Sequence, residues 1–233
     1  MKSMARANIE RNVEEVLARL ERAATQVGVP TPTLVAVTKS GSVDEVVDLV
    51  STGLISHIGE NRVQMFLERQ SAILAAGYAP KFHLIGSLQT NKVKYITGKV
   101  DLVQSLDSLR LAEEMEKQAA KRGVITSCLV EINSGREVEK GGILPEDAEG
   151  FLEALNAYPH IVVRGLMTMA PVTPTPEDAR PYFRQTKALF DRLGQGGAFG
   201  DNPILSMGMS DTYEVATQEG ATMVRIGRAF FKP

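Results

Sequence analysis

The chain opens on a helical pattern. Residues 5–27 carry apolar side chains at intervals of three and four among Glu and Arg residues, which places one apolar stripe along a helix. Gly28 and Pro30 end this pattern, because neither residue favours continuation of a helix. The stripe consists of Ile9, Val13, Val16, Leu17, Leu20, Ala24 and Val27. The sequence therefore predicts a leading amphipathic helix before the first strand.

Short apolar runs then alternate with further helical patterns. Thr33–Lys39 is rich in β-branched and apolar residues, which is typical of a strand buried in a parallel sheet. Ser42 and Glu45 follow at the spacing of a capping box and predict a helix as far as Thr52. Strand and helix together form one βα unit.

The same unit recurs along the rest of the chain. Further strands are predicted at Ile55–Glu60, Lys81–Gly86, Leu102–Ser105, Ile125–Ile132, Val162–Met169, Ile204–Met207 and Thr222–Ile226. Helices are predicted between them at Arg62–Ala76, Lys92–Ile96, Leu109–Lys121, Glu146–Ala157, Glu177–Leu193 and Thr212–Gln218. Each strand except the last is therefore followed by a helix.

This order favours an α/β fold, a single (β/α)8 TIM barrel with an extra N-terminal helix. The leading helix would wrap beneath the barrel or take the place of the missing last helix. A doubly wound open sheet is the main alternative, but TKSGSVDE after the first strand lacks the G-x-G-x-x-G turn of a dinucleotide-binding sheet. The glycine-rich segment 194–202 is interpreted as a flexible connection before the seventh strand.

Length and composition agree with one barrel. The 233 residues favour a single domain over 1–233, and 43% hydrophobic residues can fill its core. Basic and acidic residues number 26 and 28, so no basic excess exists to hold nucleic acid. Cys128 is the single cysteine, which excludes an internal disulfide and suits a reducing cytoplasm. We find neither an apolar stretch long enough to span a membrane nor an export signal, and therefore expect a cytoplasmic protein.

Polar residues gather where the predicted strands end, and these ends form the active-site face of a TIM barrel. They are Thr38, Lys39, Glu60, Asn61, His83, Ser87, Gln89, Glu131, Asn133, Thr168, Ser206, Ser210, Arg225 and Gly227. Lys39 is the most informative. Inside a barrel, loss of water and neighbouring cations favour the neutral amine, which can attack an aldehyde. A lysine that extends to solvent at the strand end is the alternative.

The end of the chain suggests an anion site opposite this amine. Ser210 begins the pattern of a helix start with Asp211 and Glu214, and Gly227 follows Arg225 at the end of the eighth strand. Loops after strands seven and eight of a barrel commonly hold phosphate, because helical N–H groups point there. Alternatively, Ser210 only caps a helix and Gly227 only forms a turn.

An amine, an arginine and an anion site at one opening would suit a phosphorylated aldehyde, of which pyridoxal 5′-phosphate (PLP) is the obvious candidate. Lys39 would condense with the aldehyde, while backbone amides and the Ser210 hydroxyl would bind the phosphate. Arg225 would face the pyridine nitrogen, and its permanent charge would keep that nitrogen unprotonated.

Six motifs, taken in order, resemble a known family. They are LVAVTK (34–39), IGEN (58–61), FHLIGSLQTNK (82–92), RGLMTMA (164–170), LSMGMSD (205–211) and MVRIG (223–227). As a set they resemble the pyridoxal-phosphate homeostasis proteins, and the resemblance covers nearly the whole chain. It implies a barrel like the N-terminal domain of alanine racemase. It also implies that Lys39 forms the Schiff base, that Arg225 lies at the pyridine nitrogen, and that Ser210 and the backbone near Gly227 bind phosphate.

Four more residues complete the expected cofactor site. The resemblance places Asn61 near the cofactor and Met207 beneath its ring. His83 lies on a buried strand, where a hydrogen-bonded core histidine is the first interpretation and a contact with the cofactor is the second. Arg228 stands where the family usually has a small hydroxyl residue, and pairing with the phosphate is the role left open to it.

The function implied is PLP binding for buffering or delivery of the cofactor inside the cell, which affects amino-acid and keto-acid balance. Racemases add a second domain with a catalytic tyrosine from the partner subunit, and after Pro233 no residues are left to build one, so we expect no robust catalysis. A minimal PLP-dependent racemase with Lys39 as its base is the alternative. A barrel that binds a phosphorylated metabolite without an aldehyde is a third possibility. Expected partners are PLP and PLP-dependent apo-enzymes, not nucleic acid or membranes, and we expect a monomer.

Overall fold

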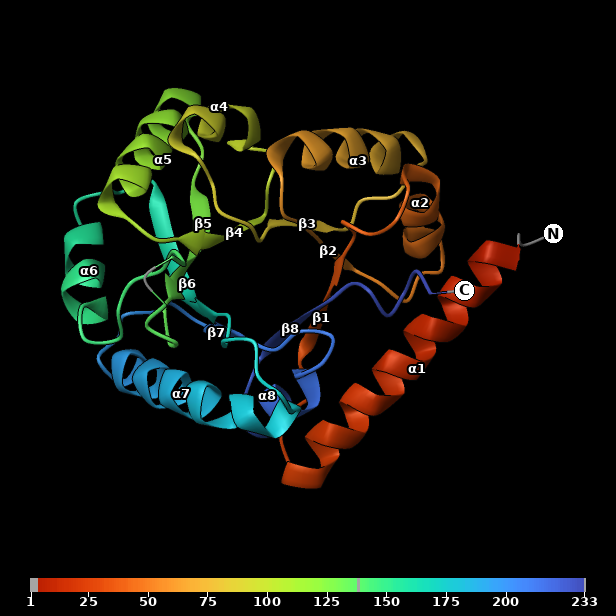
Figure 1. The fold of residues 1–233 in the computed structure, drawn as a ribbon. Coiled ribbons are helices and arrows are strands. Elements are labelled where there is room, and N and C mark those ends of the chain that lie inside the picture. Colours follow the sequence, from red (N-terminus) through yellow and green to blue (C-terminus); the bar gives the residue numbers. More distant parts are fainter. Residues whose placement is uncertain (1–3, 138, 233) are drawn as a thin grey trace.

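The computed structural model describes residues 4–137 and 139–232, and its strands close into a parallel barrel in the order β1 to β8 (Figure 1). The strands are β1 (Thr33–Val37), β2 (His57–Glu60), β3 (Lys81–Leu84), β4 (Leu102–Leu106), β5 (Thr126–Ile132), β6 (Ile161–Thr168), β7 (Ile204–Ser206) and β8 (Met223–Ile226). The helices are α1 (Met4–Val27), α2 (Val43–Ser51), α3 (Val63–Ala75), α4 (Val93–Ile96), α5 (Leu109–Arg122), α6 (Ala148–Leu155), α7 (Arg180–Gln195) and α8 (Tyr213–Gln218). Two 3-10 turns, η1 (Thr90–Lys92) and η2 (Pro176–Ala179), precede α4 and α7.

The predicted fold class is confirmed, and each predicted strand lies close to its expected place. The capping box of α2 is also confirmed, since Ser42 accepts a hydrogen bond from the Glu45 N–H and the Glu45 side chain accepts one from the Ser42 N–H. The helix expected at 177–193 is divided: Thr175 and Asp178 form a capping box at the start of η2, and α7 begins after it, at Arg180.

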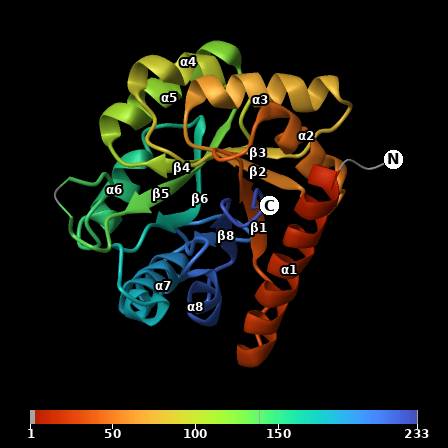
Figure 2. The ribbon, with the colours of Figure 1, turned by 45° about the vertical axis from the view of Figure 1, so that its right-hand side comes forward.

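Helix α1 takes the place of the helix that would follow β8. It packs between α8 and α2 on the outside of the barrel, and Figures 1 and 2 both show it beside the last segment of the chain. Asn12 Nδ2 donates hydrogen bonds to the carbonyl oxygens of Phe230 at 3.1 Å and Lys232 at 3.0 Å. Arg6 donates to the carbonyl oxygen of Ser51 at the end of α2. Of the two positions predicted for this helix, the structure therefore selects the second.

The strands separate two hydrophobic regions. Leu34 and Ala36 of β1 belong to the large core between strands and helices, whereas Val35 belongs to a small cluster inside the barrel. This alternation follows from the two-residue period of a strand, which turns successive side chains to opposite faces. The interior cluster consists of Val35, Leu102, Leu129, Met167 and Met223. The remaining space inside the barrel is available to polar side chains.

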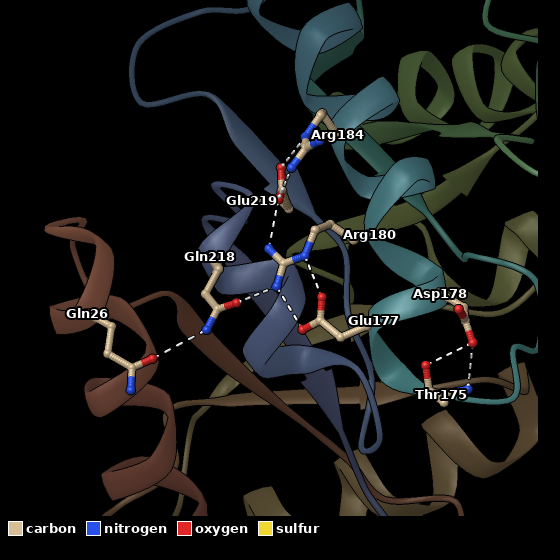
Figure 3. Close-up of polar contacts among 8 residues, drawn as sticks. All are labelled: Gln26, Thr175, Glu177, Asp178, Arg180, Arg184, Gln218 and Glu219. Carbon is tan, nitrogen blue, oxygen red and sulfur yellow. Dashed lines mark hydrogen bonds and ion pairs between the residues drawn. The ribbon is translucent and has the colours of Figure 1, made fainter.

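Arg180 fixes the start of α7 to the neighbouring helices (Figure 3). Its guanidinium contacts both carboxylate oxygens of Glu177, at 2.7 and 2.8 Å, and Glu219 Oε1 at 2.8 Å. It also donates to Gln218 Oε1 at 2.7 Å, and Gln218 donates in turn to Gln26 of α1 at 3.3 Å. The turn η2 is thereby tied to α8 and α1, which holds the chain that leaves β6.

Among the described helices we find none whose length and apolar character would let it cross a membrane.

Candidate functional site

A cavity of about 660 Å³ opens at the carboxyl ends of the strands. Its lining comes from the ends of β1, β2, β3, β6, β7 and β8 and from the segments that follow them. Of the residues predicted for the site, it brings together Lys39, Asn61, Ser210, Arg225, Gly227 and Arg228. Residues separated by almost the whole chain therefore share one opening, as the order of strands around the barrel requires.

Lys39 lies two residues beyond β1 and is exposed at the rim of the cavity. The chain turns here, and Gly41 N–H donates a hydrogen bond to the carbonyl oxygen of Thr38 at 3.0 Å, so that Lys39 and Ser40 are the central residues of the turn. Lys39 is therefore open to solvent, as the alternative interpretation predicts, and it also lines the cavity. A ligand can reach it without any opening of the fold.

A buried cluster on α3 and β2 holds this turn. Arg69 and Glu60 form an ion pair with side chains 5% and 2% exposed, and the Thr38 hydroxyl donates to the same carboxylate. Arg69 Nη2 also donates to the carbonyl oxygen of Gly41 at 2.6 Å. Its Nη1 donates to the Thr38 hydroxyl at 3.5 Å, so the guanidinium contacts both ends of the four-residue turn that carries Lys39. Sequence analysis missed Arg69, which lies in a helix among other polar residues.

Arg225 lies at the floor of the cavity and is 4% exposed. Its Nη1 donates to Ser206 Oγ at 2.6 Å and its Nη2 donates to the carbonyl oxygen of Thr168 at 2.9 Å. Burial lowers the pKa of Arg225 to about 10, and the charge of Glu131 opposes that shift. Because 10 is still far above neutral pH, the guanidinium remains a buried cation at the base of the opening.

Glu131 on β5 supplies a carboxyl group on the same side of the barrel. Its pKa is raised to about 7, chiefly by burial and also by the neighbouring Asp107, while the charge of Arg225 opposes the shift. The pKa of Asp107 is also raised, chiefly by burial. Near neutral pH, Glu131 therefore exchanges between the acid and the carboxylate close to the charge of Arg225.

The structure corrects one interpretation of Ser210. Helix α8 begins at Tyr213 and its N-cap residue is Thr212, so Ser210 does not cap the helix. The Thr212 hydroxyl instead accepts a hydrogen bond from the Met209 N–H at 3.2 Å. Ser210 lies in the loop between β7 and α8 and lines the cavity. Its hydroxyl is therefore not committed to the helix start.

Arg228 follows β8 and lines the same cavity as Ser210. It forms an ion pair with Asp211, which also lines the cavity, and both side chains are exposed.

Two glycines permit close approach of backbone segments at the cavity. A Cβ atom at Gly227 would lie 2.5 Å from the carbonyl oxygen of Val37, and one at Gly86 would lie 2.4 Å from that of Asn61. Only glycine fits at such distances. The Oδ1 atom of Asn61 is buried and has no hydrogen-bond partner among the described residues, although Asn61 lines the cavity. This oxygen is an acceptor available to a ligand.

His83 and Met207 lie apart from the cavity lining. His83 is a buried histidine bonded to His57 at 2.9 Å and to Gln104 at 2.9 Å, as its first interpretation predicts. Met207 is fully buried in the core between strands and helices. The contacts predicted between these two side chains and the cofactor stay predictions.

The arrangement as a whole combines an accessible amine, a buried cation, an unpaired amide oxygen and a free hydroxyl at one opening. It can form a carbon–nitrogen bond with a carbonyl compound while the guanidinium and hydroxyl bind its polar groups. The fold and this site define the class of barrel found in the N-terminal half of alanine racemases. Residues 6–233 match the family model described as "Alanine racemase, N-terminal domain".

Curated relatives place the chain more narrowly. A protein of Aquifex aeolicus named "Pyridoxal phosphate homeostasis protein" is 47% identical over 173 residues, which are 74% of this chain and 75% of the relative. A protein of Deinococcus radiodurans with the same name is 36% identical over 222 residues, 94% of this chain and 99% of the relative. The chain belongs to the pyridoxal phosphate homeostasis protein family.

Solved structures agree with this assignment. A crystal structure described as that of "an unknown protein from Bifidobacterium adolescentis" superposes with a TM-score of 0.91 at 30% identity, over 99% of this chain and 97% of the other. PipY of Synechococcus elongatus, solved with PLP bound, has a TM-score of 0.79 at 29% identity and covers 93% of this chain and 100% of its own. Alanine racemase of Corynebacterium glutamicum shares the fold, with a TM-score of 0.71 at 17% identity.

Proposed function

We propose that this chain binds PLP covalently but reversibly through Lys39 and serves to buffer or deliver the cofactor. One observation carries the proposal: the accessible amine of Lys39 and the buried guanidinium of Arg225 line the same cavity. Membership of the family, and the PLP bound to PipY, support the same ligand.

The residues present fit PLP in size and chemistry. The cavity volume of about 660 Å³ lies within the range of pockets that hold small ligands. Two of the five N–H donors of Arg225 are bonded to described residues, which leaves donors for a ring nitrogen. The unpaired Oδ1 of Asn61 needs a donor such as a ring hydroxyl. The Ser210 hydroxyl and the Arg228 guanidinium suit a phosphate.

The side chains of this protein would act mainly by binding and orientation. When bound, PLP supplies an aldehyde that forms a C=N bond with an amine and releases water. Lys39 would provide that amine from a turn whose two ends are held by Arg69. Arg225, charged at neutral pH, would donate to the pyridine nitrogen and prevent its protonation. Because that reduces electron withdrawal by the ring, the site favours retention of the cofactor over proton abstraction.

The same features argue for a carrier. Lys39 is the one predicted base in the cavity lining, and two-base racemisation requires a second base on the opposite face. The racemase alternative predicts exchange of the Cα hydrogen of amino acids with solvent deuterium. Exchange above that of free PLP, in a screen of a panel of amino acids, would favour the enzyme.

The chain would act as one PLP-binding domain over residues 1–233, in the cytoplasm, as a monomer. Its macromolecular partners would be PLP-dependent apo-enzymes that accept the cofactor. Exposure of Lys39 at the cavity rim supports direct transfer, because an incoming amine can reach the bound aldehyde from solvent.

Borohydride trapping tests the proposal. Wild-type protein mixed with PLP should show a new visible absorption band, and reduction followed by mass spectrometry should place one reduced adduct on Lys39. Lys39→Ala should lose both signals, whereas Lys99→Ala, which changes an exposed lysine elsewhere, should keep them. A wild type without band or adduct would exclude the proposal. PLP retained without an adduct would instead indicate the third possibility, a site for phosphorylated compounds that lacks covalent chemistry.

A further inference from the structure

Five polar side chains form a continuous hydrogen-bond network across the interior of the barrel. Arg225 donates to Ser206 Oγ at 2.6 Å, and Ser206 donates to Gln104 Oε1 at 2.7 Å. Gln104 Nε2 lies 2.9 Å from His83 Nδ1, and His83 Nε2 lies 2.9 Å from His57 Nδ1. These residues come from β8, β7, β4, β3 and β2. The hydrogen-bond network thus begins at Arg225 on the cavity floor and ends at His57, a half-buried histidine at the start of β2.

The charge on Arg225 fixes the direction of every bond. Arginine has donors only, so Ser206 Oγ must accept from it and direct its own proton to Gln104 Oε1. The Gln104 amide then presents its NH2 group to His83 Nδ1, which must accept. His83 therefore carries its proton on Nε2 and donates it to His57 Nδ1. All four bonds point away from the cavity.

Burial makes this direction hard to reverse. Gln104 and Ser206 are fully buried and His83 is 2% exposed. Reversal of one bond alone would place two donors or two acceptors against each other, and an unsatisfied buried polar group costs about 1 to 3 kcal/mol. Burial lowers the pKa of His83 to about 3, with a further contribution from His57, so this ring stays neutral. Burial also lowers the pKa of His57, whose charged neighbours are Asp101 and Lys81.

We propose that Gln104 is a positioning residue for the cofactor site: through Ser206 it orients the Arg225 guanidinium toward the cavity. This inference rests on the proposed function, because PLP is the ligand that Arg225 would face. Glutamine suits the position because one side chain must accept from Ser206 and donate to His83. Glutamate offers two acceptors, and leucine offers neither group.

Imidazole nitrogen NMR of the protein without PLP tests the donor-to-acceptor direction of the hydrogen-bond network. In the wild type, His83 should show an unprotonated Nδ1 and a protonated Nε2 at neutral pH. In Gln104→Glu the carboxylate cannot donate, so His83 should become protonated at Nδ1. A wild-type His83 already protonated at Nδ1, or a tautomer unchanged in Gln104→Glu, would overturn the proposed direction.

PLP binding tests the positioning role. Gln104→Leu and Ser206→Ala should each raise the Kd for PLP about tenfold, the size of one lost hydrogen bond, and should shift the absorption maximum of the bound cofactor. Gln104→Glu still accepts a hydrogen bond from Ser206 and should change both quantities less. Thr186→Val is the control, because it removes a buried hydroxyl of α7 that is not part of the hydrogen-bond network. It should reduce stability without changing the Kd or the spectrum.

The outcomes separate this inference from the proposed function. A wild type that does not bind PLP overturns both. A wild type that binds PLP, together with an unchanged Kd and spectrum in folded Gln104→Leu and Ser206→Ala variants, overturns only the positioning role. If Gln104→Leu does not fold, Ser206→Ala carries the same test, because it removes only one hydroxyl group.

Discussion

Arg69 and Glu60 form a buried ion pair directly behind the turn that carries Lys39. Removal of one partner of such a pair leaves an uncompensated charge and costs about 3 to 5 kcal/mol. We therefore expect Arg69→Met to lower the free energy of unfolding by that amount in urea titrations. Reaction of Lys39 with PLP should also slow, because the turn loses the hydrogen bond from Arg69 to the Gly41 carbonyl oxygen.

The double variant Glu60→Gln/Arg69→Met provides the control for this change. It removes both charges, so most of the lost stability should return. The rate of reaction with PLP should stay slow, because the bond to the Gly41 carbonyl is still absent. A double variant that reacts like the wild type would show that the pair has no role in holding the turn.

Gly86→Ala should weaken the cofactor site through the backbone of Asn61. The added Cβ would lie 2.4 Å from the Asn61 carbonyl oxygen, so one of the two segments must move. We expect a loss of about 1 to 3 kcal/mol in stability, typical of overpacking, and a weaker affinity for PLP in fluorescence titrations. Gly150→Ala in α6 meets open space and should be neutral or stabilising. Equal effects of the two substitutions would contradict this account.

Glu131 should make stability depend on pH. Its folded pKa of about 7 lies above the ordinary value of 4.5, so the folded state retains a proton that the unfolded chain releases. The corresponding stabilisation is complete below pH 4.5 and is lost as the pH rises through 7. The free energy of unfolding of Glu131→Gln should therefore exceed that of the wild type by up to about 3 kcal/mol at pH 8, and by less than about 1 kcal/mol at pH 5. Parallel pH profiles of the two proteins would refute the raised pKa.

Arg228 should contribute to affinity but little to stability. Its ion pair with Asp211 is exposed, and such pairs contribute about 0 to 1 kcal/mol. If Arg228 binds the phosphate, Arg228→Ala should raise the Kd for PLP at low salt, and the difference should diminish at high salt because the charge is screened. Asp211→Asn should have the opposite effect, since it releases the guanidinium. Isothermal titration at two ionic strengths decides between these outcomes.

The sequence predicted most of the fold because each parallel strand is a short apolar run between helical patterns. Val35 and its neighbours, for example, fill both faces of β1. The strand ends earlier than its pattern suggests, at Val37, because Arg69 binds the turn from outside the strand. The position of α1 was left open, since its stripe fits either place and only the contacts with α8 and α2 decide.

The sequence indicated the strand-end residues Lys39, Asn61 and Arg225, which line one cavity, but it did not indicate the residues that support them from behind. Arg69 looks like any exposed helical arginine, and only tertiary packing buries it. Gln104 carried a usable signal, because a glutamine inside the apolar run LVQSL must find partners within the barrel. The cap assigned to Ser210 failed because the chain continues to Thr212 before it becomes helical.

Because α1 occupies the place of the helix that would follow β8, its contacts with the end of the chain can form only late in synthesis. The bond from Asn12 reaches a carbonyl 218 residues later in the chain. At about 5 to 20 residues per second, a ribosome supplies that partner roughly 10 to 40 seconds after α1 emerges. Throughout this interval Val13 and Leu20, which are fully buried at the end, lack their final neighbours. The seam between β1 and β8 can therefore close only after the last strand has been synthesised.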